Sequence, residues 1–232
     1  METIYQAICL SKRYGSHPAL SGVNFALGPG RFVGLLVPNG SGKTTLIKIS
    51  AGLLAPTDGS VLICGQEPGP ATKAVTSYLP DRMALPKEMR AADVVELYRD
   101  FFADFDSEKA KAMLADLKLN PSQRIGAMSK GTQEKLQLCL VMSRSARLYL
   151  LDEPLGGVDP AAREYILSTI LRNYSENATL VLSTHLIGDI EKVLDEVVLL
   201  KEGRVLLQDS VDHLREEQGM SVDAYFKEVF RC

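Results

Sequence analysis

The chain has 232 residues, of which 46% are hydrophobic, and its 26 basic and 29 acidic side chains give it a net charge of −3. A chain of this length buries roughly 70–75% of its unfolded surface, so its fold needs neither a metal nor a disulfide. The charge balance argues against nucleic-acid binding, which requires a basic surface.

The first third of the chain predicts short strands around one glycine-rich loop. Strands are expected at residues 4–10, 21–27, 31–37, 60–65 and 77–80. The first two flank a turn at 11–20, and the third, RFVGLLV, is a continuous apolar run long enough for one buried strand. A loop and a helix are expected between residues 40 and 52.

The middle of the chain, residues 86–145, has helical patterns such as AADVVELYRDFFADF and SEKAKAMLADLKL. Beyond it, strand patterns return and alternate with helices, and the expected strands are residues 147–152, 178–184 and a pair within 196–208. Such alternation predicts a mostly parallel sheet with helices on both faces.

A single α/β domain is therefore expected for the whole chain. Residues 1–85 and 146–210 would form its core, residues 86–145 a helical insertion, and residues 211–232 a helical tail. No function is assigned to this tail from the sequence.

The stretch LLVPNGSGKTT, residues 35–45, predicts a phosphate-binding loop. A strand, a glycine-rich turn and a helix start let backbone N–H groups converge on an anion, aided by the partial positive charge of the helix N-terminus. Lys43 is the expected phosphate lysine and Thr44 the expected magnesium ligand. The other residues expected to contact the nucleotide here are Asn39, Gly40, Ser41, Gly42 and Thr45.

Val37 stands where the pattern G-x-x-x-x-G-K-[ST] has its first glycine. If this position required a positive φ, a β-branched residue would be strained by roughly 1–3 kcal/mol, which would weaken binding about tenfold or more. If the position ends a strand with a negative φ, valine suits it. Because both later glycines are present, nucleotide binding is expected to survive.

A second motif, LYLLDEP at residues 148–154, ends an apolar run with two acids. Asp152 at the end of a buried strand is expected to hold magnesium through water, and Glu153 to polarise an attacking water. An apolar run followed by two acids is weak alone, but in a chain with a phosphate loop it indicates nucleotide hydrolysis.

The cysteines and the apolar runs indicate a cytosolic chain. Cys9, Cys64, Cys139 and Cys232 are scattered without a C-x-x-C pair, which predicts free thiols in a reducing compartment. The N-terminus carries polar residues too early for a signal peptide. No apolar run approaches the roughly 20 residues that span a bilayer.

Together these motifs resemble the ATP-binding subunit of an ABC transporter, from Tyr14 to about residue 210. The resemblance implies a P-loop ATPase with a RecA-like core, an N-terminal antiparallel β subdomain and a helical signature subdomain. The family's signature LSGGQ is similar to MSKGT here, in which Ser129 and Gly131 keep the positions that contact the γ-phosphate. Lys130 and Thr132 depart from the pattern.

Four further residues acquire roles from the resemblance alone. Tyr14 is similar to the aromatic residue that stacks on adenine, and His185 to the switch histidine at the γ-phosphate. Asp159, in GGVD, is similar to the acid of the loop that crosses the dimer interface. Asp81 replaces the glutamine of the family's Q-loop, where it would hold magnesium or water with a shorter reach.

The resemblance implies a motor that uses ATP and Mg²⁺ and sits on the inner face of the cell membrane. Its partners would be transmembrane permease subunits and a second ATP-binding subunit packed head-to-tail, and the motifs are most similar to those of bacterial antibiotic or lantibiotic exporters. Residues 83–89, MALPKEM, either dock on the permease or pack on the sheet.

Two other hypotheses remain open at the level of sequence. One is a regulatory subunit in which Val37 and Asp81 have cost catalysis and a partner chain holds the competent site. The other is an ABC-type protein with no transporter, although these commonly have two ATPase units or long coiled-coil inserts, and neither is present in the sequence.

Overall fold

The computed structural model describes residues 2–38, 40–82, 85–175 and 177–230. Asn39, Cys232 and residues 83–84, on which some of the expectations above fall, lie outside the described residues. The remaining cysteines are free thiols, as expected.

The N-terminal strands form a three-stranded antiparallel sheet in the order β2-β1-β4. Its strands are β1 (Tyr5–Tyr14), β2 (His17–Leu27) and β4 (Asp58–Ile63). The turn expected over residues 11–20 is wrong, because Tyr14 pairs with His17 and only two residues connect the strands. Gly15, with φ 59°, supplies the left-handed residue that such a short hairpin requires.

A six-stranded sheet in the order β5-β6-β7-β3-β8-β9 forms the centre of the molecule. Its strands are β3 (Phe32–Leu36), β5 (Thr76–Leu79), β6 (Leu148–Asp152), β7 (Thr179–Thr184), β8 (Glu196–Lys201) and β9 (Arg204–Ser210). All neighbours are parallel except the β8–β9 hairpin. The mostly parallel sheet predicted from the sequence is therefore confirmed.

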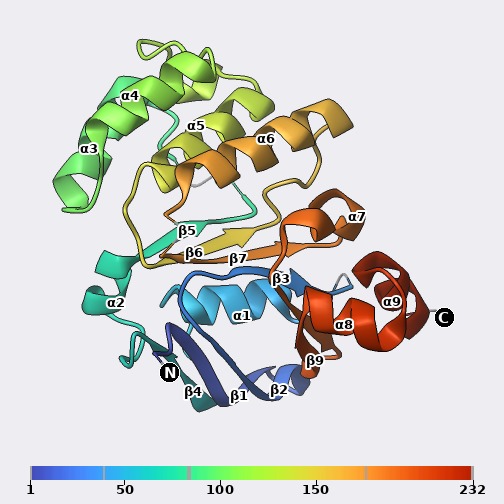
Figure 1. Cartoon of the computed structure of the whole chain (residues 1–232). Coiled ribbons are helices and arrows are strands. Elements are labelled where there is room, and N and C mark those ends of the chain that lie inside the picture. Colours follow the sequence, from blue (N-terminus) through green and yellow to red (C-terminus); the bar gives the residue numbers. More distant parts are fainter. Residues whose placement is uncertain (1, 39, 83–84, 176, 231–232) are drawn as a thin grey trace.

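Helices cover both faces of this sheet (Figure 1). They are α1 (Lys43–Ser50), α2 (Pro70–Val75), α3 (Ala91–Phe101), α4 (Ser107–Asp116), α5 (Lys130–Met142), α6 (Pro160–Asn173), α7 (Ile187–Ile190), α8 (Val211–Gln218) and α9 (Val222–Val229). Single 3-10 turns occupy Ile125–Ala127 and Glu191–Val193. Helix α1 lies between the two sheets, while α5 and α6 lie on the opposite face of the large sheet (Figure 1). None of the described helices is long and apolar enough to cross a membrane.

Strand β3 divides the hydrophobic core into two clusters, because successive side chains of a strand point to opposite faces. Phe32 and Leu36 join the cluster under the helical segment, whereas Val33, Leu35 and Val37 join the cluster around α1 and the antiparallel sheet. All five are at most 1% exposed. A continuous apolar run is typical of a strand buried on both faces.

Arg144 joins the helical segment to the core. Its side chain is 3% exposed and pairs with Asp104 at 2.9 Å. The same guanidinium donates to the carbonyl oxygens of Thr76 at 2.6 Å and Ala74 at 2.7 Å, and it lies over the ring of Phe102. One side chain therefore supplies hydrogen bonds to carbonyl oxygens of α2 and β5 and a charge partner to Asp104 in the loop between α3 and α4.

The C-terminal tail packs beside the end of β9 (Figure 1). Val211, Leu214 and Val222 are buried in the main core cluster. Glu191, which follows α7, accepts hydrogen bonds from Arg215 at 2.9 Å and from the backbone N–H of Val222 at 3.0 Å. The helical tail expected from the sequence is thus part of the packed domain.

Candidate active site

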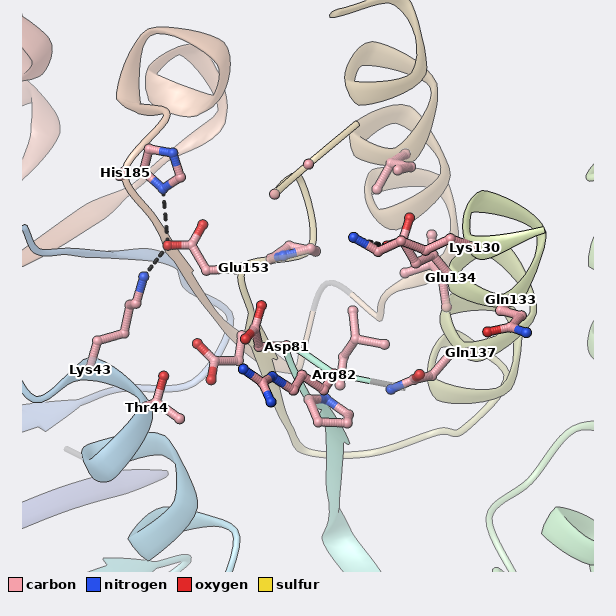
Figure 2. Close-up of a pocket in the computed structure, with 18 of the residues that line it drawn as sticks. Lys43, Thr44, Asp81, Arg82, Lys130, Gln133, Glu134, Gln137, Glu153 and His185 are labelled. Atoms are coloured by element: carbon pink, nitrogen blue, oxygen red, sulfur yellow. Dashed lines mark hydrogen bonds and ion pairs between the residues drawn. The ribbon is translucent and has the colours of Figure 1, made fainter. Parts of the chain in front are cut away.

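A cavity of about 700 Å³ opens at the carboxyl ends of the parallel strands, where α/β sheets generally bind ligands. Residues from the ends of β5, β6 and β7 line one side together with the start of α1, and residues from the start of α5 line the other (Figure 2). The polar residues in its wall are Lys43, Thr44, Asp81, Arg82, Lys130, Gln133, Glu134, Gln137, Asp152, Glu153 and His185.

The phosphate loop has the backbone that its glycines predict. Gly40 and Gly42 have φ of 84° and 93°, in the left-handed region that favours glycine. A Cβ at Gly42 would lie 2.3 Å from the carbonyl oxygen of Ala19, so only glycine fits against β2 there. Helix α1 starts at Lys43 directly after this turn, which leaves its first N–H groups free to meet an anion.

Val37 has none of the backbone strain that a glycine-requiring position would impose. It is not among the described non-glycine residues with a positive φ. Its side chain is fully buried and continues the alternation of β3. Of the two alternatives, the one in which valine simply ends the strand is correct, and Val37 gives no reason to expect weakened nucleotide binding.

We expect Val37→Gly to lower the free energy of unfolding by about 2–4 kcal/mol, because it removes a buried side chain and raises the conformational entropy of the unfolded chain. Turnover of ATP per folded molecule should change less than about twofold, a difference well under 1 kcal/mol. Urea unfolding and a turnover assay measure the two effects, with Val37→Ala as the intermediate variant. A several-fold gain in turnover with glycine would show that valine does strain the loop.

The hydroxyl of Ser183 contacts both acids at the end of β6, Asp152 and Glu153. Asp152 is 1% exposed, and its Oδ1 accepts a hydrogen bond from the hydroxyl of Ser183 at 2.7 Å. Burial raises the pKa of Asp152, and the hydrogen bond from Ser183 partly offsets this shift. The backbone N–H of Glu153 donates to the Ser183 hydroxyl at 3.1 Å, and Glu153 has a left-handed backbone, with φ 51°.

The three residues predicted to be catalytic meet at one oxygen atom. Oε1 of Glu153 accepts a hydrogen bond from the Lys43 ammonium and lies 3.1 Å from Nδ1 of His185 (Figure 2). The side chains of Lys43 and Glu153 are each 10% exposed, so their charges are poorly screened by solvent. The Lys43 ammonium is thus paired with an anionic oxygen at the wall of the cavity.

The residues fit a magnesium ion, which prefers oxygen ligands. Oδ2 of Asp152 and Oε2 of Glu153 are buried without a hydrogen-bond partner, and such buried acceptors are costly unless something else binds them. The side chains of Thr44 and Asp81 line the same cavity. Thr44 and Asp152 are therefore suited to hold the ion, with Asp81 as a further oxygen donor.

The signature stretch lies at the start of α5. Ser129 is its N-cap and accepts a hydrogen bond from the N–H of Thr132 at 3.2 Å. Ser129 and Gly131 are not in the wall of the cavity, whereas Lys130, which departs from the family pattern, is. A Cβ added at Gly131 would meet open space.

The other predicted nucleotide contacts that the structure describes do not line the cavity. Tyr14 ends β1, is 53% exposed, and has the ammonium of Lys12 at 5.5 Å from its ring centroid. Ser41, Gly42 and Thr45 belong to the loop and the first turn of α1 but not to the cavity wall. Asn39 lies outside the described residues.

Sequence reasoning did not predict five polar residues of the wall, which are Arg82, Lys130, Gln133, Glu134 and Gln137. Arg82 follows Asp81 and could have been found as part of the same loop. The others lie on α5, and their place in the wall depends on how the helical segment packs on the core, which no local pattern records.

The fold and this site define a P-loop nucleotide-binding protein. The ABC transporter family model matches residues 20–156, more than half of the chain. This chain belongs to the ABC transporter family, as an ATP-binding subunit of a transport system. The family and the fold class expected from the sequence are therefore confirmed. Members of this family bind and hydrolyse ATP and generally work with transmembrane components.

Similar proteins include the ABC transporter ATP-binding protein YxlF of Bacillus subtilis (strain 168), 30% identical and matching 92% of this chain and 73% of its own length. Nod factor export ATP-binding protein I of Burkholderia orbicola (strain AU 1054) is 27% identical, with 90% and 71% covered. A solved ATP-binding subunit of an ABC transporter superposes with a TM-score of 0.89 at 27% identity, covering 98% of this chain and 100% of that one.

Proposed function

We propose that this chain is the Mg²⁺-dependent ATPase of an ABC exporter, bound to the cytoplasmic side of transmembrane permease subunits and paired head-to-tail with a second ATP-binding subunit. The observation that carries the hydrolytic part is the meeting of Lys43, Glu153 and His185 at the wall of one cavity, beside the unpartnered oxygen of Asp152. Export as the direction is supported by the relatives named for Nod factor export, at 27–28% identity.

The residues divide the work of phosphoryl transfer by position and charge. The Lys43 ammonium, now on Glu153, exchanges that carboxylate for the phosphate oxygens of ATP, helped by the N–H groups at the start of α1. Glu153 then orients a water molecule and accepts its proton as the water oxygen attacks the γ-phosphorus. The bond between the γ-phosphorus and the β–γ bridging oxygen breaks in the same step, and ADP leaves. His185 donates a hydrogen bond to the γ-phosphate.

Magnesium, when bound, would offset negative charge on the phosphates. Thr44 and Asp152 would hold it, and the buried Oδ2 of Asp152 would gain the partner it lacks. Asp152 can act as a ligand only when its carboxyl is deprotonated, and the burial that raises its pKa disfavours that charged form.

Head-to-tail pairing is supported by the place of the signature residues. Ser129 and Gly131 stand at the N-terminal end of α5, where a helix attracts an anion, yet they do not line the cavity of their own chain. We infer that they contact the γ-phosphate bound by the second subunit, and that Asp159 lies at the interface between the two.

The regulatory alternative has lost one of its two grounds, because Val37 carries no backbone strain. Asp81 still departs from the family's glutamine, but it lies in the cavity wall with the catalytic residues. The working ATPase is therefore the better supported hypothesis. Binding of ATP without turnover by the purified chain would reverse this choice.

Gly131→Glu should block ATP-driven pairing without preventing ATP binding. A Cβ at position 131 meets nothing within 4 Å in its own chain, so the effect is expected from repulsion between the added carboxylate and the phosphate bound by the second subunit. Light scattering on a Glu153→Gln background, with ATP and Mg²⁺, should show a dimer for the parent and for Gly131→Ala and a monomer for Gly131→Glu. Equal dimerisation of all three would contradict head-to-tail pairing.

A further inference from the structure

A closed ring of contacts connects the loop at the expected dimer interface to the switch histidine. The loop leaves Glu153 through a turn in which the N–H of Gly156 donates to the Glu153 carbonyl at 3.0 Å. It reaches Val158, whose carbonyl oxygen accepts a hydrogen bond from Nε of Arg163 at 3.1 Å. The guanidinium of Arg163 therefore contacts the backbone of this loop.

The other edge of the same guanidinium holds the helix that follows His185. Nη1 of Arg163 lies 3.1 Å from Oδ2 of Asp189, on α7. Four residues earlier in the chain, Nδ1 of His185 lies 3.1 Å from Oε1 of Glu153, and this contact closes the ring. Arg163 thus contacts both the loop and α7.

The chemistry of this connection requires arginine. A guanidinium presents donors on two edges of one rigid plane, so it can hold a carbonyl and a carboxylate in different directions at once. A lysine would supply one mobile ammonium. The Arg163 side chain is 26% exposed, so its pairing with Asp189 is screened less than that of a fully solvated pair.

The remainder of α7 is fixed to the core. Ile187 and Ile190 are at most 1% exposed, so this short helix moves only if its packing changes. The polar contact with Arg163 therefore acts on a helix that has few other degrees of freedom. A shift of the loop at Val158 would be passed through Arg163 to Asp189 on α7, and so to His185, which lies just before this helix in the chain.

We propose that Arg163 is a positioning residue that couples the loop at residues 156–159 to His185. When the second subunit presses on this loop, Arg163 carries the displacement to α7 and sets the imidazole of His185 against Glu153 and the γ-phosphate. The coupling rests on the proposed function, because it needs both the interface loop and the switch role of His185. It assigns to Arg163 a part in turnover that involves no contact with ATP.

The first test compares Arg163→Met with Arg172→Met, an exposed arginine on the same helix α6. Arg163→Met should lower kcat about tenfold or more and leave KM within about twofold, because misplacement of a catalytic group slows chemistry more than binding. Arg172→Met should leave both unchanged. Arg163→Lys, which keeps the charge but not the two-edged geometry, should fall between them.

A second measurement separates positioning from general stability. In a His185→Ala background, Arg163→Met should cause less than about a twofold further loss in a radiolabelled phosphate-release assay, because the residue it positions is gone. A further tenfold loss there, or full kcat in the single variant, would overturn the proposal.

A third measurement does not depend on turnover. Amide hydrogen exchange in the nucleotide-free chain should become faster at residues 156–160 and 185–190 together in Arg163→Met but not in Arg172→Met. Unchanged exchange in both segments would overturn the coupling even if the parent chain hydrolysed ATP. Conversely, a parent chain without turnover would contradict the proposed ATPase, while the exchange result would still decide whether Arg163 connects the two segments.

Discussion

Replacing Glu153 with glutamine lowers the rate of ATP turnover by about 10²–10⁴-fold, the usual contribution of a general base, while ATP binding is retained. The amide keeps the size of the side chain and an acceptor oxygen, but it cannot take a proton from water. The expected result is therefore a chain that binds Mg²⁺ and ATP and accumulates in the bound form.

Binding should not weaken in this variant, because of the contact that the carboxylate makes without nucleotide. Oε1 of Glu153 holds the ammonium of Lys43, and ATP must displace it. A neutral amide holds the ammonium less strongly, so Lys43 is more readily available to phosphate. Calorimetric titration with ATP and a phosphate-release assay measure the two effects on the same preparation.

Glu202→Gln is the matched control for this substitution. Glu202 also has a left-handed backbone, with φ 50°, but it lies exposed at the β8–β9 turn and outside the cavity wall. Any effect of the substitution on a left-handed backbone should therefore be seen in both variants. Turnover retained in Glu153→Gln would refute the role of Glu153 as the general base. Asp81, another acid in the wall, would then be the next candidate for this role.

The elements that sequence reasoning placed well are those whose pattern is enforced by burial. The runs that became β3, β6 and β7 are buried at every residue, and a continuous apolar stretch of strand length allows few alternatives. The short helix α2 was missed, because its six residues, PATKAV, carry no helical periodicity. The predicted turn around Gly15 was too long, because the exposed ends of β1 and β2 are polar and their sequence resembles that of a turn.

In the candidate site, too, some features were predictable from the sequence and others were not. Lys43, Asp152 and Glu153 were predicted because motifs record the chemistry of a phosphate loop and of acids at a strand end. Motifs do not record that Lys43 contacts Glu153 across 110 residues of sequence, or that Lys130 faces the same cavity. The first contact follows from the order of β3, β7 and β6 in the large sheet, and the second from how the helical segment packs on the core. Both are properties of the whole chain.

The packing of the helical segment on the core depends strongly on Arg144, and we expect Arg144→Met to lower the free energy of unfolding by about 3–5 kcal/mol. The side chain is 3% exposed, so its partners have little access to water once it is removed. Asp104 would lose its cation, and the carbonyl oxygens of Thr76 and Ala74 would lose their donors. Buried acceptors left without partners account for most of this cost.

Urea unfolding of Arg144→Met beside Arg99→Met measures the effect against a matched control. Arg99 pairs with Glu96 and Asp100, but its side chain is 53% exposed, and ion pairs of this kind contribute at most about 1 kcal/mol. Similar losses in the two variants would show that burial does not make the Arg144 network special.

If Arg144→Met does not fold, Arg144→Lys provides the second test of the same network. Lysine keeps the charge beside Asp104 but cannot reach the carbonyl oxygens of Thr76 and Ala74 with the same planar donors. A smaller loss, with faster hydrogen exchange confined to α2, β5 and the loop between α3 and α4, is the expected result. An unchanged exchange pattern would mean that hydrophobic packing alone holds the helical segment, and with it Lys130 and Gln133, against the catalytic side of the cavity.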